Sequence, residues 1–157
     1  ARFRRGAWGA LESEVGTVIL PEPVASTTRA ALEDLRRRVP PGGRLASFPE
    51  GGFFTYALGL TNPLPQEQFF PGHLSEEEES RTIARLRESP PDAVLLANVL
   101  AVGHRARVFG KDYLAGLDAF LHTRFATAAS YGPGAGPQAA IGDPQFFLEI
   151  RVPAPPP

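Results

Sequence analysis

One stretch of this sequence, from Arg44 to Asn62, constrains the fold most, because it combines three local signals. It reads RLASFPEGGFFTYALGLTN. The apolar run Leu45–Phe48 predicts a buried strand, Pro-Glu-Gly-Gly predicts a tight turn, and the aromatic run Phe53–Leu58 predicts a short helix. Strand, glycine turn and helix in succession are half of the repeating unit of an α/β sheet. Such sheets bind ligands where the chain leaves the carboxyl end of a strand, and Glu50 occupies that place.

The apolar runs in the rest of the chain extend this alternation of strands and helices. Asp92–Leu100 is apolar without alternation, which predicts a strand covered on both faces. Gln145–Val152 alternates, which predicts a half-buried strand that forms a wide hairpin with Ala126–Tyr131. We further expect a strand at Val15–Leu20 and helices at Thr27–Val39, from Ser75 (with a Ser75–Glu78 capping box) and at Lys111–Phe125.

This order predicts an α/β fold, a three-layer sandwich with a mostly parallel sheet, helices on both faces and an antiparallel strand at the C-terminal end. At 157 residues, the chain has the length of one domain. We expect an irregular N-terminal arm over residues 1–14, a single α/β domain over 15–153 and a disordered tail over 154–157.

Composition excludes several classes of site. The net charge of −1 gives no strong field for nucleic acid or for an anionic membrane. Cysteine is absent, so disulfides and thiolate metal sites are excluded. His73, His104 and His122 are too scattered for a known metal motif, and the sequence contains no GxGxxG, GxxxxGK[ST] or GxSxG. We therefore predict no metal and no cofactor. No run reaches the ~20 apolar residues of a membrane span.

A candidate binding site follows from the places where strands end. Carboxylates and amides bind sugar hydroxyls, and an aromatic face covers the apolar side of a sugar ring. The long loop of residues 59–74 follows the turn and is of the kind that often carries function. The candidate residues are Glu50, Gly51, Gly52, Asn62, Phe69, Phe70 and Asn98. The structural alternative is that Glu50 caps the amides of the following helix and that both phenylalanines pack inward.

Four stretches together resemble a known family. They are LASFPEGGFFTYALGLTNP (Leu45–Pro63), the run Phe69–Asn98, FGKDY (Phe109–Tyr113) and GDPQFFLEIRVP (Gly142–Pro153). They are similar to the soluble C-terminal domain of bacterial multi-spanning membrane glycosyltransferases of the dolichyl-phosphate-mannose-protein-mannosyltransferase-like and arabinosyltransferase-like group. The resemblance implies an extracytoplasmic domain that follows a bundle of membrane helices. It also implies a catalytic carboxylate in a loop between early spans, which no position of this sequence matches.

Two hypotheses of different classes follow. In the first, the chain is the non-catalytic extracytoplasmic domain of a glycosyltransferase that uses a polyprenyl-phosphate sugar. It would lie against the membrane-spanning part of the same chain and bind or position a glycan, a lipid-linked sugar or a protein acceptor. In the second, it is a free-standing soluble α/β enzyme or nucleotide-binding module that uses Glu50 and Asn98. In either case we expect the isolated domain to be a monomer.

Overall fold

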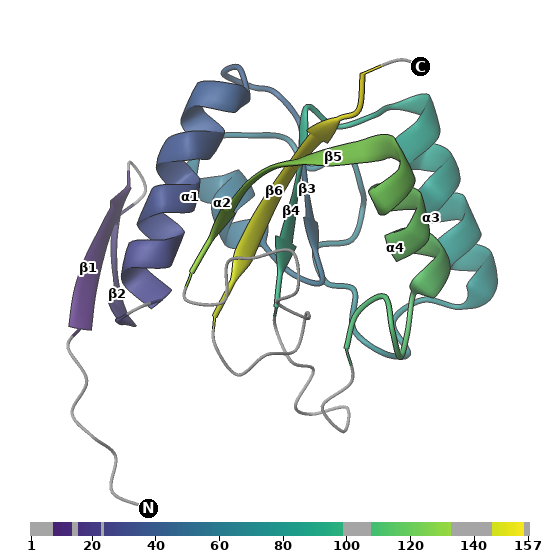
Figure 1. The fold of residues 1–157 in the computed structure, drawn as a ribbon, viewed down its shortest axis with the longest axis horizontal. Coiled ribbons are helices and arrows are strands. Elements are labelled where there is room, and N and C mark those ends of the chain that lie inside the picture. Colours follow the sequence, from purple (N-terminus) through teal and green to yellow (C-terminus); the bar gives the residue numbers. More distant parts are fainter. Residues whose placement is uncertain (1–7, 14–15, 23, 99–107, 133–145, 156–157) are drawn as a thin grey trace, which may run out of the picture.

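The computed structural model describes residues 8–13, 16–22, 24–98, 108–132 and 146–155 (Figure 1). Strands and helices alternate through its central part, as expected from the sequence. In chain order the elements are β1 (Trp8–Ser13), β2 (Gly16–Pro21), α1 (Val24–Arg38), β3 (Leu45–Phe48), α2 (Gly52–Ala57), α3 (Glu76–Glu88), β4 (Ala93–Ala97), α4 (Ala115–Arg124), β5 (Phe125–Tyr131) and β6 (Leu148–Pro153).

The main sheet has four strands in the order β3-β4-β6-β5 and is mostly antiparallel. Only β3 and β4 pair in parallel, whereas β4–β6 and β5–β6 are antiparallel. The prediction of a mostly parallel sheet was therefore wrong, although the mixed α/β class and the antiparallel last strand were right. The reason lies in the strand order. β6 lies between β4 and β5 and pairs antiparallel with both, and β2 does not join this sheet because it pairs with β1 in a separate two-stranded sheet.

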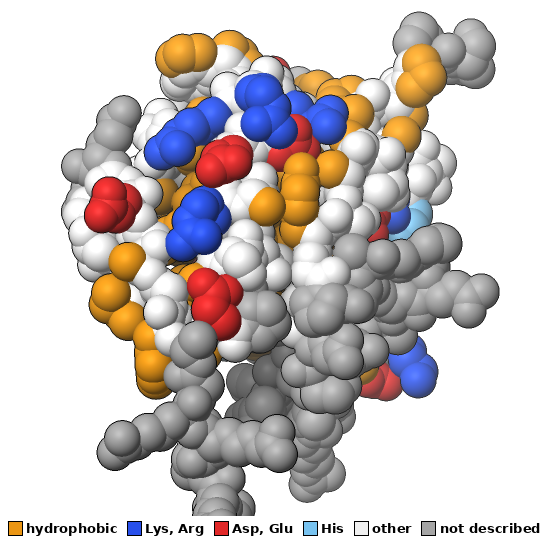
Figure 2. Space-filling model, turned by 60° about the vertical axis from the view of Figure 1, so that its left-hand side comes forward, with side chains coloured by type: hydrophobic (Ala, Val, Ile, Leu, Met, Phe, Trp, Pro, Cys, Tyr) orange, Lys and Arg blue, Asp and Glu red, His pale blue; other side chains and the backbone are white. Residues whose placement is uncertain are grey.

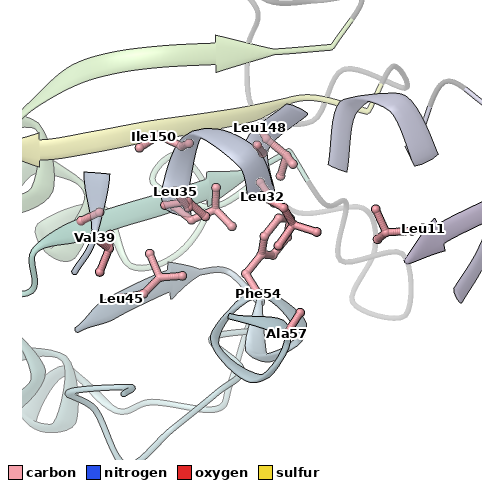
Figure 3. Close-up of a cluster of buried hydrophobic side chains, with 13 residues drawn as sticks. Leu11, Leu32, Leu35, Val39, Leu45, Phe54, Ala57, Leu148 and Ile150 are labelled. Carbon is pink, nitrogen blue, oxygen red and sulfur yellow. The ribbon is translucent and has the colours of Figure 1, made fainter. Parts of the chain in front are cut away.

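Alternate residues of β3 and β4 face two separate hydrophobic clusters. Leu45 and Leu95 belong to a cluster with α1 and α2, whose labelled side chains converge in Figure 3. Phe48 and Leu96 belong to a second cluster with α3 and α4. Since neighbouring side chains of a strand point to opposite faces, the two clusters lie on opposite sides of these strands. The expected burial of the 92–100 run on both faces is confirmed over β4, while residues 99–100 lie outside the described part.

The expected irregular arm over residues 1–14 contains a strand in its described part. β1 pairs antiparallel with β2 along its whole length and rests on α1 through Leu11, which is 1% exposed. On the other side of this hairpin, Trp8 and Ile19 are exposed. The local sequence of β1 is weakly β-forming, so its structure comes from pairing with β2 and from packing on α1. Residues 1–7 lie outside the described part.

The helices begin and end close to the expected residues, with two differences. The capping box of α3 is confirmed, because the Ser75 side chain accepts from the Glu78 amide while Glu78 accepts from the Ser75 amide. α1 begins three residues before the expected Thr27, at Val24, and the Glu22 carboxylate accepts from the Ser26 amide at 3.2 Å. α4 begins only at Ala115, after Leu114 in the left-handed conformation.

The C-terminal strand differs from the half-buried strand predicted by its alternation. Leu148, Ile150 and Arg151 of β6 are all buried, because neighbours cover this strand on both edges and both faces. Arg151 is accommodated by its Nη1, which donates to the Phe125 carbonyl at 3.1 Å, and by an ion pair with Glu149. The expected hairpin with β5 is confirmed. In the expected disordered tail, the Ala154 amide donates to the Arg124 carbonyl at 2.9 Å.

The face of the molecule seen in Figure 2 carries basic and acidic side chains next to one another. On α1, exposed Arg37 and Arg38 both pair with the buried Asp34, at 3.0 Å and 2.7 Å. Within the described residues, no helix is both long and apolar enough to cross a membrane.

Candidate functional site

The turn from β3 into α2 forms the edge of a groove. Gly51 packs directly on β3: a Cβ added to it would lie 2.3 Å from the Ser47 Cβ. The backbone can make this tight turn only because Gly51 lacks a side chain. α2 starts without any side-chain cap, so Glu50 does not have the capping role that was the structural alternative for it. The Glu50 carboxylate is partly exposed at the carboxyl end of β3, as the sequence predicted.

The long loop after α2 returns to this turn and adds polar groups to it. Glu50 and Gln68 form an antiparallel bridge, and the Phe69 amide donates to the Pro49 carbonyl at 2.7 Å. This pairing places Glu67 beside Gly52, where a Cβ on Gly52 would lie 3.0 Å from the Glu67 Oε2. The space next to the two glycines is thus filled by Ser47 and Glu67, and the glycines serve packing within the chain.

The groove has a volume of about 530 Å³ and lies at the carboxyl ends of β3 and β4. Strand β2 and the first turns of α1 form its other wall. Its polar side chains are Thr28, Glu50, Glu67 and Gln68, and Gly51 and Gly52 contribute backbone. Its apolar side chains are Val18, Leu20, Val24, Phe53, Phe54, Ala97, Phe146 and Leu148.

The groove carries negative charge. Glu50 and Glu67 line it, and no Lys, Arg or His is among its described lining residues. The negative charge of Glu50 also affects the pKa of Tyr113. Burial raises the pKa of Tyr113 to about 12, with further contributions from the charges of Asp112 and Glu50. The Tyr113 hydroxyl is buried and has no hydrogen-bond partner within the described part of the chain, so it remains protonated at physiological pH.

Three of the residues predicted from the sequence, Glu50, Gly51 and Gly52, line this groove together. Phe69 does not: it is 1% exposed, and its ring centroid lies 4.7 Å from that of Phe48 in the cluster beneath α3 and α4. Phe70 is half-buried, with its ring edge-on to His73 at 5.7 Å. The two phenylalanines therefore do not form a joint stacking platform.

The two predicted asparagines organise the walls of the site. Asn62 shapes its loop, because its Nδ2 donates to the Gln66 carbonyl at 2.8 Å and its Oδ1 accepts from the Leu64 amide at 3.0 Å. Asn98 is buried, and its Oδ1 accepts from the Phe147 amide at 2.6 Å. This bond fixes the chain between Phe146 and Leu148, both of which line the groove.

Sequence reasoning missed Glu67, Gln68, Thr28 and Phe146. A signal existed for Gln68: neighbours in an extended segment point to opposite sides, so a buried Phe69 implies an outward Gln68. Thr28 and Phe146 reach the groove through tertiary packing, which no local pattern announces. Of the three histidines considered for a metal motif, His104 lies outside the described residues. Within the described residues, no three His, Cys, Asp or Glu side chains are arranged to hold a metal ion.

Comparison with known proteins gives no further guide to this groove. No protein-family model, no curated protein and no solved structure matches the chain.

Proposed function

We propose that this chain is the extracytoplasmic domain of a membrane glycosyltransferase that uses a polyprenyl-phosphate sugar, and that its groove binds a glycan acceptor. The observation that carries the proposal is the composition of the groove. Two carboxylates and an amide, Glu50, Glu67 and Gln68, lie beside partly exposed phenylalanines. A few polar groups on an apolar surface are the usual make-up of a site for a small ligand, and these groups match sugar hydroxyls.

The family resemblance of the sequence supports the wider setting. It gives the domain a partner, the membrane-spanning part of the same chain, and a location on the extracytoplasmic face of the bacterial inner membrane. In this proposal the chemistry takes place in the membrane-spanning part, and the domain holds the acceptor. The groove accordingly supplies hydrogen-bond acceptors and an apolar surface.

The charge of the groove disfavours the alternative of a nucleotide-binding module. Nucleotide phosphates are held by basic side chains and by exposed amides at the start of a helix. Here Glu50 and Glu67 stand beside the first turn of α2, and no basic side chain is among the described lining residues. A polyphosphate entering this groove would meet two like charges.

The test is binding of neutral oligosaccharides to the purified chain, followed by NMR chemical-shift perturbation. We expect shifts at Glu50, Glu67 and Gln68, and a loss of affinity of about tenfold in Glu50→Gln and in Glu67→Gln, since each removes a charged hydrogen-bond acceptor. Glu33→Gln on the exposed side of α1 is the matched control and should bind like the parent.

A stability measurement separates binding from folding. Because Glu50 caps no helix, Glu50→Gln should change the free energy of unfolding by less than about 0.5 kcal/mol. Absence of any glycan binding, or equal losses in Glu50→Gln and Glu33→Gln, would contradict the proposed function.

A further inference from the structure

A second concave surface lies at the end of the main sheet opposite the groove, where β3 and β4 begin. It is a cleft of about 770 Å³ next to the residues that precede β3 and β4 and those that end β6. Its rim carries exposed prolines, among them Pro90 and Pro155. The last turns of α3 and α4 form one of its walls.

Three arginines from three separate segments line this cleft: Arg44, Arg87 and Arg124. None of the three forms an ion pair with any residue that the structure describes. Arg44 donates to the Ser89 hydroxyl, and the Arg87 guanidinium lies 5.4 Å from the centre of the Phe120 ring. These contacts orient two of the guanidinium groups without neutralising either.

The single carboxylate among the described lining residues, Asp92, is already engaged. Its Oδ2 accepts from the Arg44 backbone amide at 2.7 Å, which ties together the starts of β3 and β4. The cleft therefore has a surplus of positive charge. This contrasts with the arginines at the end of α1, where Asp34 pairs with Arg37 and Arg38.

A simpler explanation accounts for part of this arrangement. Arg87 and Arg124 lie in the last turns of α3 and α4, where cations are stabilised by the helix dipole. It does not account for Arg44, which precedes a strand and whose half-buried side chain faces the same cleft. Nor does it require that three guanidinium groups share one concave surface.

We propose that this cleft binds a phosphate monoester that carries an apolar group. Guanidinium groups donate paired hydrogen bonds to phosphate oxygens, and three of them suit the terminal oxygens of a monoester better than a single carboxylate. The prolines of the rim and the adjoining Ala154 provide the apolar contact. This site is independent of the glycan groove, which lies at the other end of the strands.

The test titrates the chain with three probes: inorganic phosphate, octyl phosphate, and phosphatidylcholine vesicles that contain phosphatidic acid. We expect octyl phosphate to bind more tightly than inorganic phosphate, and the double variant Arg87→Gln/Arg124→Gln to lose about tenfold or more in affinity. Both side chains are exposed, so the variant should stay folded. Arg85→Gln, on the same helix but outside the cleft, is the matched control and should bind like the parent.

The outcomes separate the sources of the ligand. Binding of octyl phosphate in solution identifies a soluble ester as sufficient, while binding only to the vesicles identifies a lipid head group. In both cases the double variant must bind more weakly than Arg85→Gln. Absence of binding to all three probes, or equal losses in the double variant and the control, would overturn the proposal.

Discussion

The two ends of the same pair of strands carry opposite charge. The groove at the carboxyl ends of β3 and β4 is lined by Glu50 and Glu67, whereas the cleft at their amino ends is lined by Arg44, Arg87 and Arg124. Both surfaces have apolar walls and a comparable size. The main difference lies in the charge, and it is the basis of the two proposals: a neutral, hydroxyl-rich ligand for the groove and a phosphate ester for the cleft.

The direction of the helices explains part of this separation. α1 and α3 each lead into a strand that runs back the other way, so they begin at the groove edge and end at the cleft edge. Acidic side chains are favoured at the start of a helix and basic ones at its end. Glu22 and Glu78 accordingly lie at helix starts, and Arg38 and Arg87 lie in last turns. This rule accounts for Arg87 in the cleft and likewise for Arg124 at the end of α4, but not for Arg44, Glu50 or Glu67, which lie outside the helices.

The largest expected effect comes from a substitution that disrupts the groove and the cleft at once. Leu95 lies in the middle of β4, is fully buried, and stands between the two edges. We expect Leu95→Asp to cost several kcal/mol, because it places an unpaired carboxylate in an apolar core. Thermal unfolding followed by circular dichroism should show an unfolded or strongly destabilised chain. Ile19→Asp, on the exposed face of the hairpin, is the control, and a normal melting temperature for Leu95→Asp would contradict the central role of β4.

A substitution with a smaller effect should change the structure of the groove and leave that of the cleft unaltered. Gly51→Ala places a Cβ 2.3 Å from the Ser47 Cβ, so the turn must move, at a cost of about 1–3 kcal/mol. Amide chemical shifts should change around the groove and stay constant around Arg87 and Arg124. Ser47→Gly in the same chain should restore part of the lost stability, since it removes the contacting atom. Equal shifts at both edges would show that the two regions are not structurally independent.

The smallest expected effect concerns α4, which supplies Arg124 to the cleft. Burial raises the pKa of Asp118, while the nearby His122 and Arg151 oppose that rise. A carboxyl with a raised folded pKa contributes stability at low pH that is lost as the pH rises through that pKa. As the pH rises above about 4, the ordinary pKa of an aspartate, the parent should therefore lose stability relative to Asp118→Asn. Urea unfolding at several pH values measures this.

The matched control for Asp118→Asn is Glu88→Gln, an exposed carboxyl at the end of α3. Octyl phosphate binding should be unchanged in Asp118→Asn, because this residue does not line the cleft. A parallel pH dependence for parent and Asp118→Asn would show that the half-buried Asp118 carboxyl does not contribute to the pH dependence of stability.

The sequence by itself determined the local elements. The runs Leu45–Phe48 and Ala93–Ala97 form buried strands because they are largely apolar on both faces. Helix α3 begins at its capping box because the side chains of Ser75 and Glu78 each accept a hydrogen bond from the other residue's amide. It also placed Glu50 at the carboxyl end of a strand, where the groove lies. These features depend on residues close together in the chain.

Only the tertiary structure decided which elements became neighbours. The insertion of β6 between β4 and β5 made the sheet mostly antiparallel and buried Arg151. The loop of residues 59–74 returns to Glu50, and this return buries Phe69 in the core and brings Glu67 and Gln68 to the groove. Arg44, Arg87 and Arg124 share one cleft although two of them are 80 positions apart in the chain. Such contacts form because burying apolar surface stabilises one global arrangement, and that free energy depends on the whole chain.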